Sequence, residues 1–304
     1  TTIGVIGGLF HIINHAMYKS ELFLMSGTVS RAVGSDEIAD GGGLARSLPI
    51  TFACSAIAAL AISGVPPLNG FASKWMIYQS ALSIPNHGLG TALIVVAVFG
   101  SALTLASFVK VLYSAFLAPP AGSAPSHGQV RASVKEDFFL AAPMVILAIG
   151  CIVLGLAPGL AVGPLSEPAV VGQASGAAPV VGAGGQIVLP GGVGLWSPAR
   201  ATVLIGLGLV IGSGLVWVWR LGGRIRVVRP FLGGEVPQPD DSRFRVPGTQ
   251  FYETVRKLPV VSGLLDSGEA GAMDPYHWSG RHGGTLVQAM RAQHTGLGSL
   301  YVTW

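Results

Sequence analysis

Long apolar stretches, each limited by glycine, proline or charged residues, dominate the first 220 residues of the chain. A helix needs about 20 mostly apolar residues to cross a bilayer. Five segments satisfy this length and end at residues that commonly terminate helices. We therefore predict an all-α membrane protein with about five transmembrane helices, the second of them discontinuous, at Ile3–Val29, Leu48–Ser83, Leu89–Leu117, Phe138–Leu156 and Ala199–Trp219.

The first predicted helix carries a polar stripe. His11, His15 and Lys19 are spaced four residues apart and so lie on one helical face, over about 12 Å of membrane depth. Ionisable side chains inside a bilayer cost about 2.5–3.5 kcal/mol each on insertion scales. Because imidazoles titrate near neutral pH and a desolvated amine can do so, the stripe suits a proton relay. The alternative is a polar contact between helices. Glu21 lies on a different face from Lys19, and its role stays open.

The second predicted span is interrupted. Pro66 and Pro67 lack amide hydrogens, so two carbonyls in the preceding turn lose their helical donors. Gly64 and Gly70 allow the backbone to leave helical geometry. We expect two half-helices that meet near the bilayer centre, an arrangement typical of ion sites in transporters. Lys74 then lies in the first two turns of the second half-helix, where burial and the positive helix end disfavour the ammonium. We predict that Lys74 exchanges protons.

The third predicted helix contains one further lysine, Lys110, near the end that we place at the cytoplasm. A long side chain there can extend its amine to the membrane surface, so that no transport role is needed. A proton-uptake site is the equal alternative, and we include Lys110 among the candidate relay residues on that basis.

Charge is placed unevenly along the chain. Only 11% of the residues are charged, against about a quarter in soluble domains. Residues 1–219 hold 8 Lys/Arg and 7 Asp/Glu, whereas residues 220–304 hold 10 and 7. We predict a transmembrane bundle over 1–219 and a tail over 220–304. The net charge of +4 is spread over loops and tail and does not indicate nucleic-acid binding.

The positive residues also predict the orientation, because they favour the cytoplasmic side. The second and fourth connections between spans have none, and the first, the third and the start of the tail carry Arg31, Arg46, Arg131, Lys135, Arg220, Arg224, Arg226 and Arg229. We therefore place the protein in the cell membrane as a multi-pass protein with a cytoplasmic C-terminus.

Several other features of the sequence indicate no binding site or catalytic chemistry. The glycine-rich connection at 171–194 has no lysine after its glycines, so a flexible external loop is favoured over a phosphate loop. Cys54 and Cys151 are far apart in apolar runs, where packing is the expected role. The tail histidines, His277, His282 and His294, lack ligand-like spacing. We expect no metal and no cofactor in this chain, because clustered cysteines and a dinucleotide fingerprint are missing from the sequence.

Two of these segments resemble a known family. The runs Phe10-His11-Ile12-Ile13-Asn14-His15-Ala16-Met17-Tyr18-Lys19 and Gly64-Val65-Pro66-Pro67-Leu68-Asn69-Gly70-Phe71-Ala72-Ser73-Lys74 look like the conserved helix and the broken helix of antiporter-like subunits in the complex I and Mrp superfamily. The later runs Ser107-Phe108-Val109-Lys110, Ala115-Phe116-Leu117 and Gly248-Thr249-Gln250-Phe251-Tyr252 look most similar to the branch of formate hydrogenlyase and group 4 NiFe hydrogenases. The resemblance implies that His11, His15, Lys19 and Lys74 lie on a central hydrophilic axis, with Lys74 in the outward half-channel.

The resemblance also sets the functional expectation. We expect a non-catalytic subunit that translocates protons within a redox-driven complex, with other membrane and peripheral subunits, the lipid bilayer and protons as its partners. The chain starts inside the resemblance, so we expect it to be the C-terminal part of such a subunit, without the upstream half. Two alternatives remain, a subunit of a secondary Na⁺/H⁺ antiporter and a structural membrane anchor.

Overall fold

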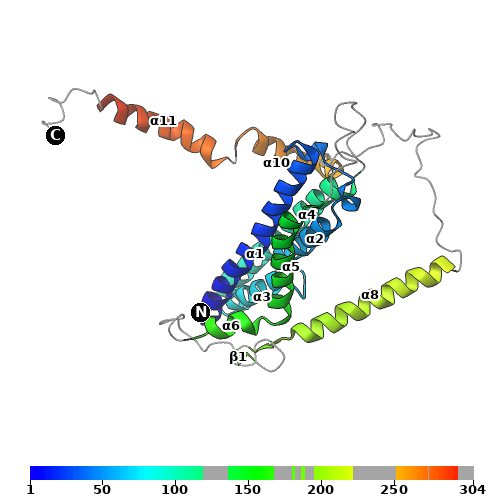
Figure 1. Ribbon diagram of the computed structural model, residues 1–304. Coiled ribbons are helices and arrows are strands. Elements are labelled where there is room, and N and C mark those ends of the chain that lie inside the picture. The colour runs from blue at the N-terminus through cyan, green and yellow to red at the C-terminus, as the bar shows by residue number, and fades with distance from the viewer. Residues whose placement is uncertain are drawn as a thin grey trace, which may run out of the picture. The chain divides into compact units, whose positions relative to one another are not determined.

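The computed structural model describes residues 1–118, 136–167, 180–181, 186–188, 195–221, 251–272 and 274–293, and these are mostly helical (Figure 1). The chain forms two compact units, Thr1–Thr249 and Gln250–Trp304. Residues 222–250 lie outside the described part, and the predicted change from bundle to tail at residue 220 therefore stays a prediction.

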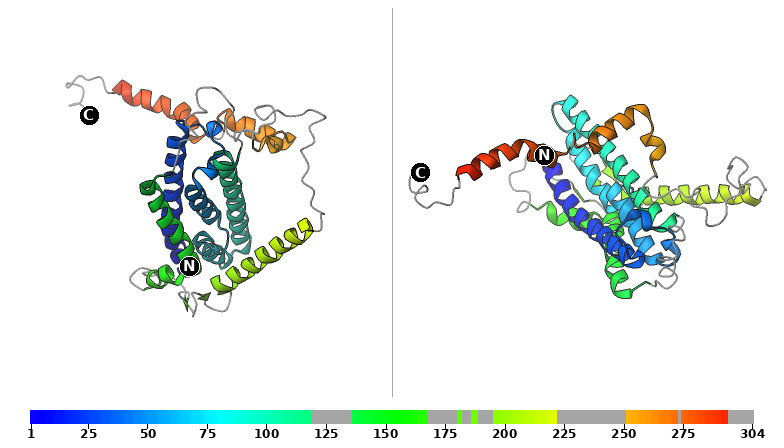
Figure 2. Two further views of the ribbon diagram at one scale, coloured as in Figure 1. Left: turned by 45° about the vertical axis from the view of Figure 1, so that its right-hand side comes forward. Right: turned by 90° about the horizontal axis from the view of Figure 1, so that it is seen from above.

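The first unit is built around a bundle of helices. These are α1 (Thr2–Val33), α2 (Pro49–Ser63), α3 (Asn69–Leu82), α4 (His87–Leu112), which continues as the π-helical turn η3 (Tyr113–Leu117), and α5 (Phe138–Leu156). Two 3-10 turns, η1 (Ile38–Asp40) and η2 (Leu44–Arg46), connect α1 to α2. Helices α2 and α3 contact α1 and α5 on one side and α4 on the other (Figure 2). The predicted interrupted span is thus the centre of the bundle.

Among the described residues, three helices are long and apolar enough to cross a membrane: His87–Leu117, Phe138–Leu156 and Pro198–Arg220, the last within α8 (Pro198–Leu221). The 32 residues of α1 extend over about 48 Å, which exceeds the bilayer core of about 30 Å. Each half-helix is too short to cross alone. The all-α membrane fold is confirmed, while the count of five spans stays a prediction.

Contacts between helix ends show which ends of α1, α4 and α5 lie at the same end of the bundle. Arg31 at the end of α1 lies 3.6 Å from the carboxylate of Asp137, which caps the start of α5 by accepting from the amide of Phe139. The amide of Gly42, between α1 and α2, donates to the carbonyl of Ala115 after α4 (3.1 Å). The end of α1, the end of η3 and the start of α5 therefore share one end of the bundle, as the predicted alternation of spans requires.

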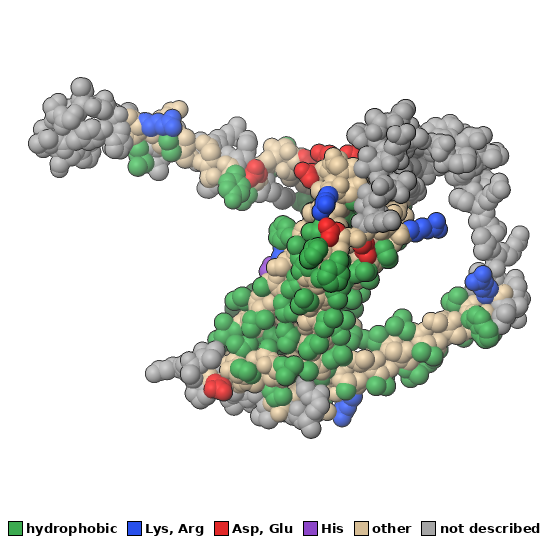
Figure 3. Space-filling view, viewed as in Figure 1, with side chains coloured by type: hydrophobic (Ala, Val, Ile, Leu, Met, Phe, Trp, Pro, Cys, Tyr) green, Lys and Arg blue, Asp and Glu red, His purple; other side chains and the backbone are tan. Residues whose placement is uncertain are grey.

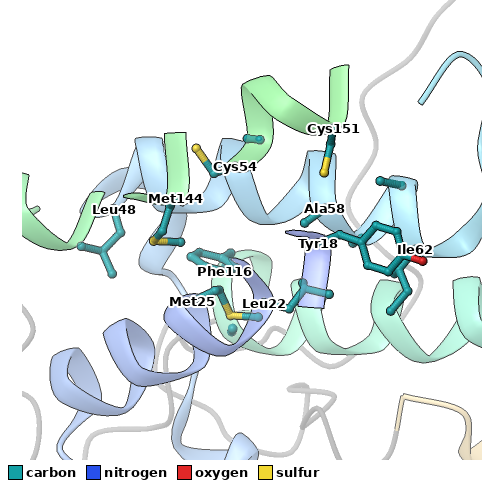
Figure 4. Close-up of a cluster of buried hydrophobic side chains, with 14 of the residues drawn as sticks. Tyr18, Leu22, Met25, Leu48, Cys54, Ala58, Ile62, Phe116, Met144 and Cys151 are labelled. Carbon is teal, nitrogen blue, oxygen red and sulfur yellow. The ribbon is translucent and has the colours of Figure 1, made fainter. Parts of the chain in front are cut away.

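The bundle is held together by an apolar core. Figure 4 shows Tyr18, Leu22 and Met25 of α1 packed with side chains from α2, α5 and η3. Cys54 and Cys151 are both buried in this cluster, which confirms their predicted packing role. Figure 3 shows that hydrophobic side chains also cover most of the visible flank of the bundle, the composition expected of a surface that faces lipid.

The fourth connection differs from the expected flexible loop. Its described residues form α6 (Gly159–Leu165) and a three-stranded antiparallel sheet in the order β1 (Val180–Val181), β2 (Ile187–Val188), β3 (Leu195–Trp196). The sheet forms because apolar side chains leave water: Ile187 is fully buried, and the ring of Trp196 lies 4.5 Å from the ring of Phe71 on α3. The expectation of a flexible loop is wrong for these residues, while Gly182, Gly184 and Gly185 lie outside the described part.

The second unit contains α9 (Glu253–Arg256), α10 (Pro259–Glu269) and α11 (Pro275–Gln293). The Arg256 guanidinium joins α9 to α10 through an ion pair with Glu269 at 2.7 Å. Of the tail histidines, His294 and the side chains of His277 and His282 lie outside the described residues.

Candidate functional site

The break between α2 and α3 is where the sequence predicts it. Gly64 ends α2 in the left-handed region (φ 83°), a conformation that favours glycine because other side chains clash there. Pro66 and Pro67 follow in the connection and cannot donate to the last turn of α2. The two predicted half-helices are confirmed.

Lys74 occupies the gap in the hydrogen bonding that the prolines create. It lies in the second turn of α3 and is half-buried. Its ammonium donates to the carbonyl of Ile62 at 2.8 Å, the very carbonyl whose helical donor would be residue 66. A buried backbone carbonyl without a donor is costly, so the break and the lysine stabilise each other.

A short polar chain continues from Lys74 to α4. The ammonium also donates to the hydroxyl of Ser101 at 3.1 Å, and this hydroxyl lies 2.9 Å from the phenol oxygen of Tyr78. Ser101 and Tyr78 each serve as donor and acceptor, so protons can be exchanged along this chain. Sequence analysis missed both residues; the spacing of Tyr78 four residues after Lys74 was the available signal.

Gly70 serves a different purpose from the one predicted. It lies inside α3 and does not have a positive φ. A side chain at this position would overlap the carbonyl oxygen of Ala61 and approach the ring of Tyr18. The predicted need for backbone freedom at Gly70 is therefore wrong, because the requirement is the close approach of α3 to the last turn of α2.

Helix α5 seals one flank of the break. A side chain at Gly155 would overlap the backbone of Pro67, Leu68 and Asn69, so the backbones of α5 and the break are in direct contact there. Gly155 is buried and lies near the end of α5. The opposite flank of the break is the one that Lys74 and Ser101 occupy.

Two asparagines fix α1 to the start of α3. The fully buried Asn14 donates from its amide to the carbonyl of Asn69 (3.0 Å) and accepts from the side-chain amide of Asn69 (2.9 Å). The Asn69 side chain in turn accepts from the amide of Gly70 at 2.8 Å. This pairing satisfies the first turn of α3, and it was not predicted, since only the fold brings the two asparagines together.

The predicted stripe on α1 is only partly assembled. His11 is half-buried, and its Nδ1 lies 2.9 Å from the hydroxyl of Ser73, the residue next to Lys74. His15 follows with its ring centroid 6.3 Å from that of His11. Lys19 instead places its ammonium over the ring of Phe23, 5.3 Å from the centroid.

Tyr18 adds an aromatic group to this row. Its ring meets that of His15 edge-on, with the centroids 5.4 Å apart, and lies 6.4 Å from that of His11. The phenol oxygen is buried and has no hydrogen-bond partner among the described residues. Sequence analysis missed Tyr18 because an interior tyrosine on its own is usually a packing residue.

Lys110 is not joined to this site. It is half-buried in the last turn of α4, and its ammonium makes no hydrogen bond or ion pair with another described residue. The two alternatives given for Lys110 both stay open.

On the expectation of proton translocation that the sequence raises, replacement of Ser101 by alanine should slow translocation by about tenfold, because a hydrogen bond to a charged group contributes about 1.5–3 kcal/mol. The loss should appear as a lower transport rate in membrane vesicles without loss of assembled protein. Ser107→Ala is the matched control, because this serine on the same helix bonds only the carbonyl of Leu103. Equal rates for the two variants would contradict a role for Ser101.

The fold and the site together define an integral membrane protein with an interrupted helix, at which a lysine meets unpaired backbone. Comparison with known proteins finds a family match over part of the chain: residues 1–104 match the model of the family described as NADH:quinone oxidoreductase/Mrp antiporter, TM, which confirms the predicted resemblance.

Curated relatives include members of the predicted branch, alongside an NADH-ubiquinone oxidoreductase chain 5 and Na⁺/H⁺ antiporter subunits. Formate hydrogenlyase subunit 3 of Escherichia coli K12 is 33% identical over 161 residues, which cover 51% of this chain and 26% of that protein. Hydrogenase-4 component B of the same organism is 29% identical over 226 residues, covering 72% of this chain and 32% of that protein. The chain thus matches a third or less of the length of these relatives.

A solved structure shares the fold. In the membrane-bound sulfane sulfur reductase, described as an archaeal respiratory membrane complex, one chain superposes with a TM-score of 0.70 over 99% of this chain and 46% of that chain. The sequences are 24% identical, and the likeness is one of architecture.

Proposed function

We propose that this chain moves protons across the cell membrane as a subunit of a redox-driven complex. The observation that carries the proposal is the bond between the Lys74 ammonium and the carbonyl of Ile62 at the break. An amine in this position can give up a proton when its partners move and regain one when they return. The names of the relatives, formate hydrogenlyase and hydrogenase, support a redox-driven assembly.

The proposed path uses the residues predicted from the sequence. Protons taken up from the cytoplasm pass along the α1 row of His11, His15 and Lys19. The contact of His11 with Ser73 supports transfer from α1 to α3, where Lys74 receives the proton. Ser101 and Tyr78 lead away from Lys74, and we assign them to the release side.

In this proposal the driving force comes from partners. Reduction or oxidation in other subunits changes the charge or conformation near the row, and the lysines and histidines respond by taking up or releasing protons. The chain is then a non-catalytic subunit, and its C-terminal unit lies in the cytoplasm, where it can contact peripheral subunits. The positive residues at the connections support this orientation.

Exchange of Na⁺ for H⁺ is the second candidate, because the family description includes the Mrp antiporters. The two are distinguished in inverted membrane vesicles that contain the whole complex. We expect electron transfer from the physiological donor to acidify the vesicle interior without added Na⁺. Proton movement that requires a Na⁺ gradient and ignores electron transfer would favour the antiporter, and electron transfer with no ion movement would favour a structural anchor.

A further inference from the structure

Glu21 is a buried carboxyl group outside the pathway proposed above. It lies on α1, faces α2 and α5, and is fully buried. One carboxyl oxygen, Oε1, accepts a hydrogen bond from the hydroxyl of Ser55 on α2 at 3.3 Å. The other, Oε2, has no hydrogen-bond partner among the described residues. A buried acid with one free oxygen needs an explanation, because such groups are rarely left unpaired.

The surroundings of Glu21 accommodate the neutral acid better than the anion. No Lys, Arg or His of the described part of the chain lies within ion-pairing distance of it. The titratable groups near it on the neighbouring helices are the thiols of Cys54 on α2 and Cys151 on α5, neither of which is a cation. On α3, Lys74 is committed to Ile62 and Ser101 instead. An unpaired buried carboxylate costs several kcal/mol, which protonation removes.

Polar groups connect Glu21 to one end of the bundle. The single hydrogen of the Ser55 hydroxyl is shared between Oε1 of Glu21 (3.3 Å) and the carbonyl of Thr51 one turn earlier on α2 (2.7 Å). The amide of Thr51 donates to the carboxylate of Glu136 at 2.6 Å. Glu136 directly precedes Asp137, which pairs with Arg31, so this line of polar groups ends where α1 ends and α5 begins.

On its other side, Glu21 is one turn from the aromatic row. Tyr18 precedes it by three residues on α1 and therefore lies on a neighbouring part of the same face. The unpaired phenol oxygen of Tyr18 and the unpaired Oε2 of Glu21 are both buried. The Tyr18 ring in turn contacts His15. Glu21 thus lies between the Glu136 end of the bundle and the two histidines.

We propose that Glu21 is an additional proton-binding residue of this chain, which is loaded from the Glu136 end of the bundle and unloaded toward Tyr18 and His15. The proton binds at Oε2, because Oε1 already accepts from Ser55, and it leaves from the same oxygen, so that the carboxyl returns to the anion. The unloading step rests on the proposed proton translocation. The binding of a proton at Glu21 does not.

Infrared spectroscopy of the full-length chain in lipid tests proton binding directly. We expect the C=O stretching band of a protonated carboxylic acid at neutral pH and its loss in Glu21→Gln, a variant that keeps the shape and an acceptor for Ser55. Ser55→Ala should keep the band but move it to higher frequency, because the carbonyl loses its donor. Glu253→Gln, at an exposed carboxylate, is the control and should leave the band unchanged. A spectrum of the wild type without the band, or a band that survives Glu21→Gln, overturns the proposal.

Proton translocation by the assembled complex tests the second half. We expect Glu21→Gln to lower the rate by about 100-fold, the lower end of what a positioned acid–base group contributes. A band that disappears together with an unchanged rate would make Glu21 a structural acid and overturn its place in the path. If Lys74 variants also translocate normally, the proposed function fails instead, and the infrared result still decides whether Glu21 holds a proton.

Discussion

Replacement of Lys74 by methionine should abolish coupled proton translocation, with a fall of about 100-fold or more, since a positioned proton-transfer group contributes 10²–10⁴-fold. Methionine is unbranched like lysine and only one atom shorter, but it cannot bind a proton or donate to the carbonyl of Ile62. The measurement is proton uptake by vesicles that contain the whole complex, normalised to the rate of electron transfer. Electron transfer itself should continue, because its cofactors belong to other subunits in this proposal.

Lys74→Arg separates charge from proton exchange. Arginine retains donors for Ile62 and Ser101 but stays protonated in proteins. We expect the Lys74→Arg variant to translocate protons as poorly as Lys74→Met, although arginine preserves the hydrogen bonds at the break better than methionine does. Lys257→Met, at an exposed lysine of the second unit that pairs with Glu253, is the control and should behave as the wild type. Active Lys74→Arg would mean that a fixed positive charge suffices, and the proposed relay would be wrong.

Replacement of Gly70 by alanine should have the largest effect on the bundle itself. The added methyl group would overlap the carbonyl oxygen of Ala61, a backbone atom that cannot rotate away. The half-helices must then separate, and the free energy of unfolding should fall by about 1–3 kcal/mol, as for other overpacked sites. Thermal unfolding in detergent, followed by tryptophan fluorescence, measures this loss.

Translocation should also fall in Gly70→Ala, since separation of α2 from α3 lengthens the bond between Lys74 and Ile62. Gly27→Ala is the matched control, because this α1 glycine has no neighbouring atom where the methyl group would lie. The control is expected to unfold at or slightly above the wild-type temperature, because alanine favours helix. Similar melting of the two variants would show that the contact with Ala61 is not tight.

The ends of helices were predicted well where residues at the helix end itself determine them. Helix α5 has the predicted bounds, because an apolar run is limited by the capping residue Asp137 and by Pro158. Helix α1 runs four residues beyond its predicted end at Val29, to Val33, since the polar residues after Val29 do not stop a helix and Gly34 does. The β-strands of the fourth connection were missed, because their stability comes from contacts with α3 that sequence spacing does not reveal.

In the candidate site, the sequence predicted which residues share a helix face but not which residues of other helices they contact. Spacing placed His11 and His15 on one face and Lys74 after the break, and these positions are confirmed. The same spacing could not show that the long side chain of Lys19 turns to Phe23. Nor could it show that Glu21 faces Ser55, because the neighbour of a helical face is set by the packing of separate helices.

The missing side chain at Gly155 makes the two flanks of the break unlike each other. Backbone lies against backbone on the α5 flank of the break, whereas the hydroxyl groups of Ser101 and Tyr78 and the amine of Lys74 line the flank toward α4. Bulk added at Gly155 would therefore displace the backbone of Pro67 to Asn69 without touching any titratable group.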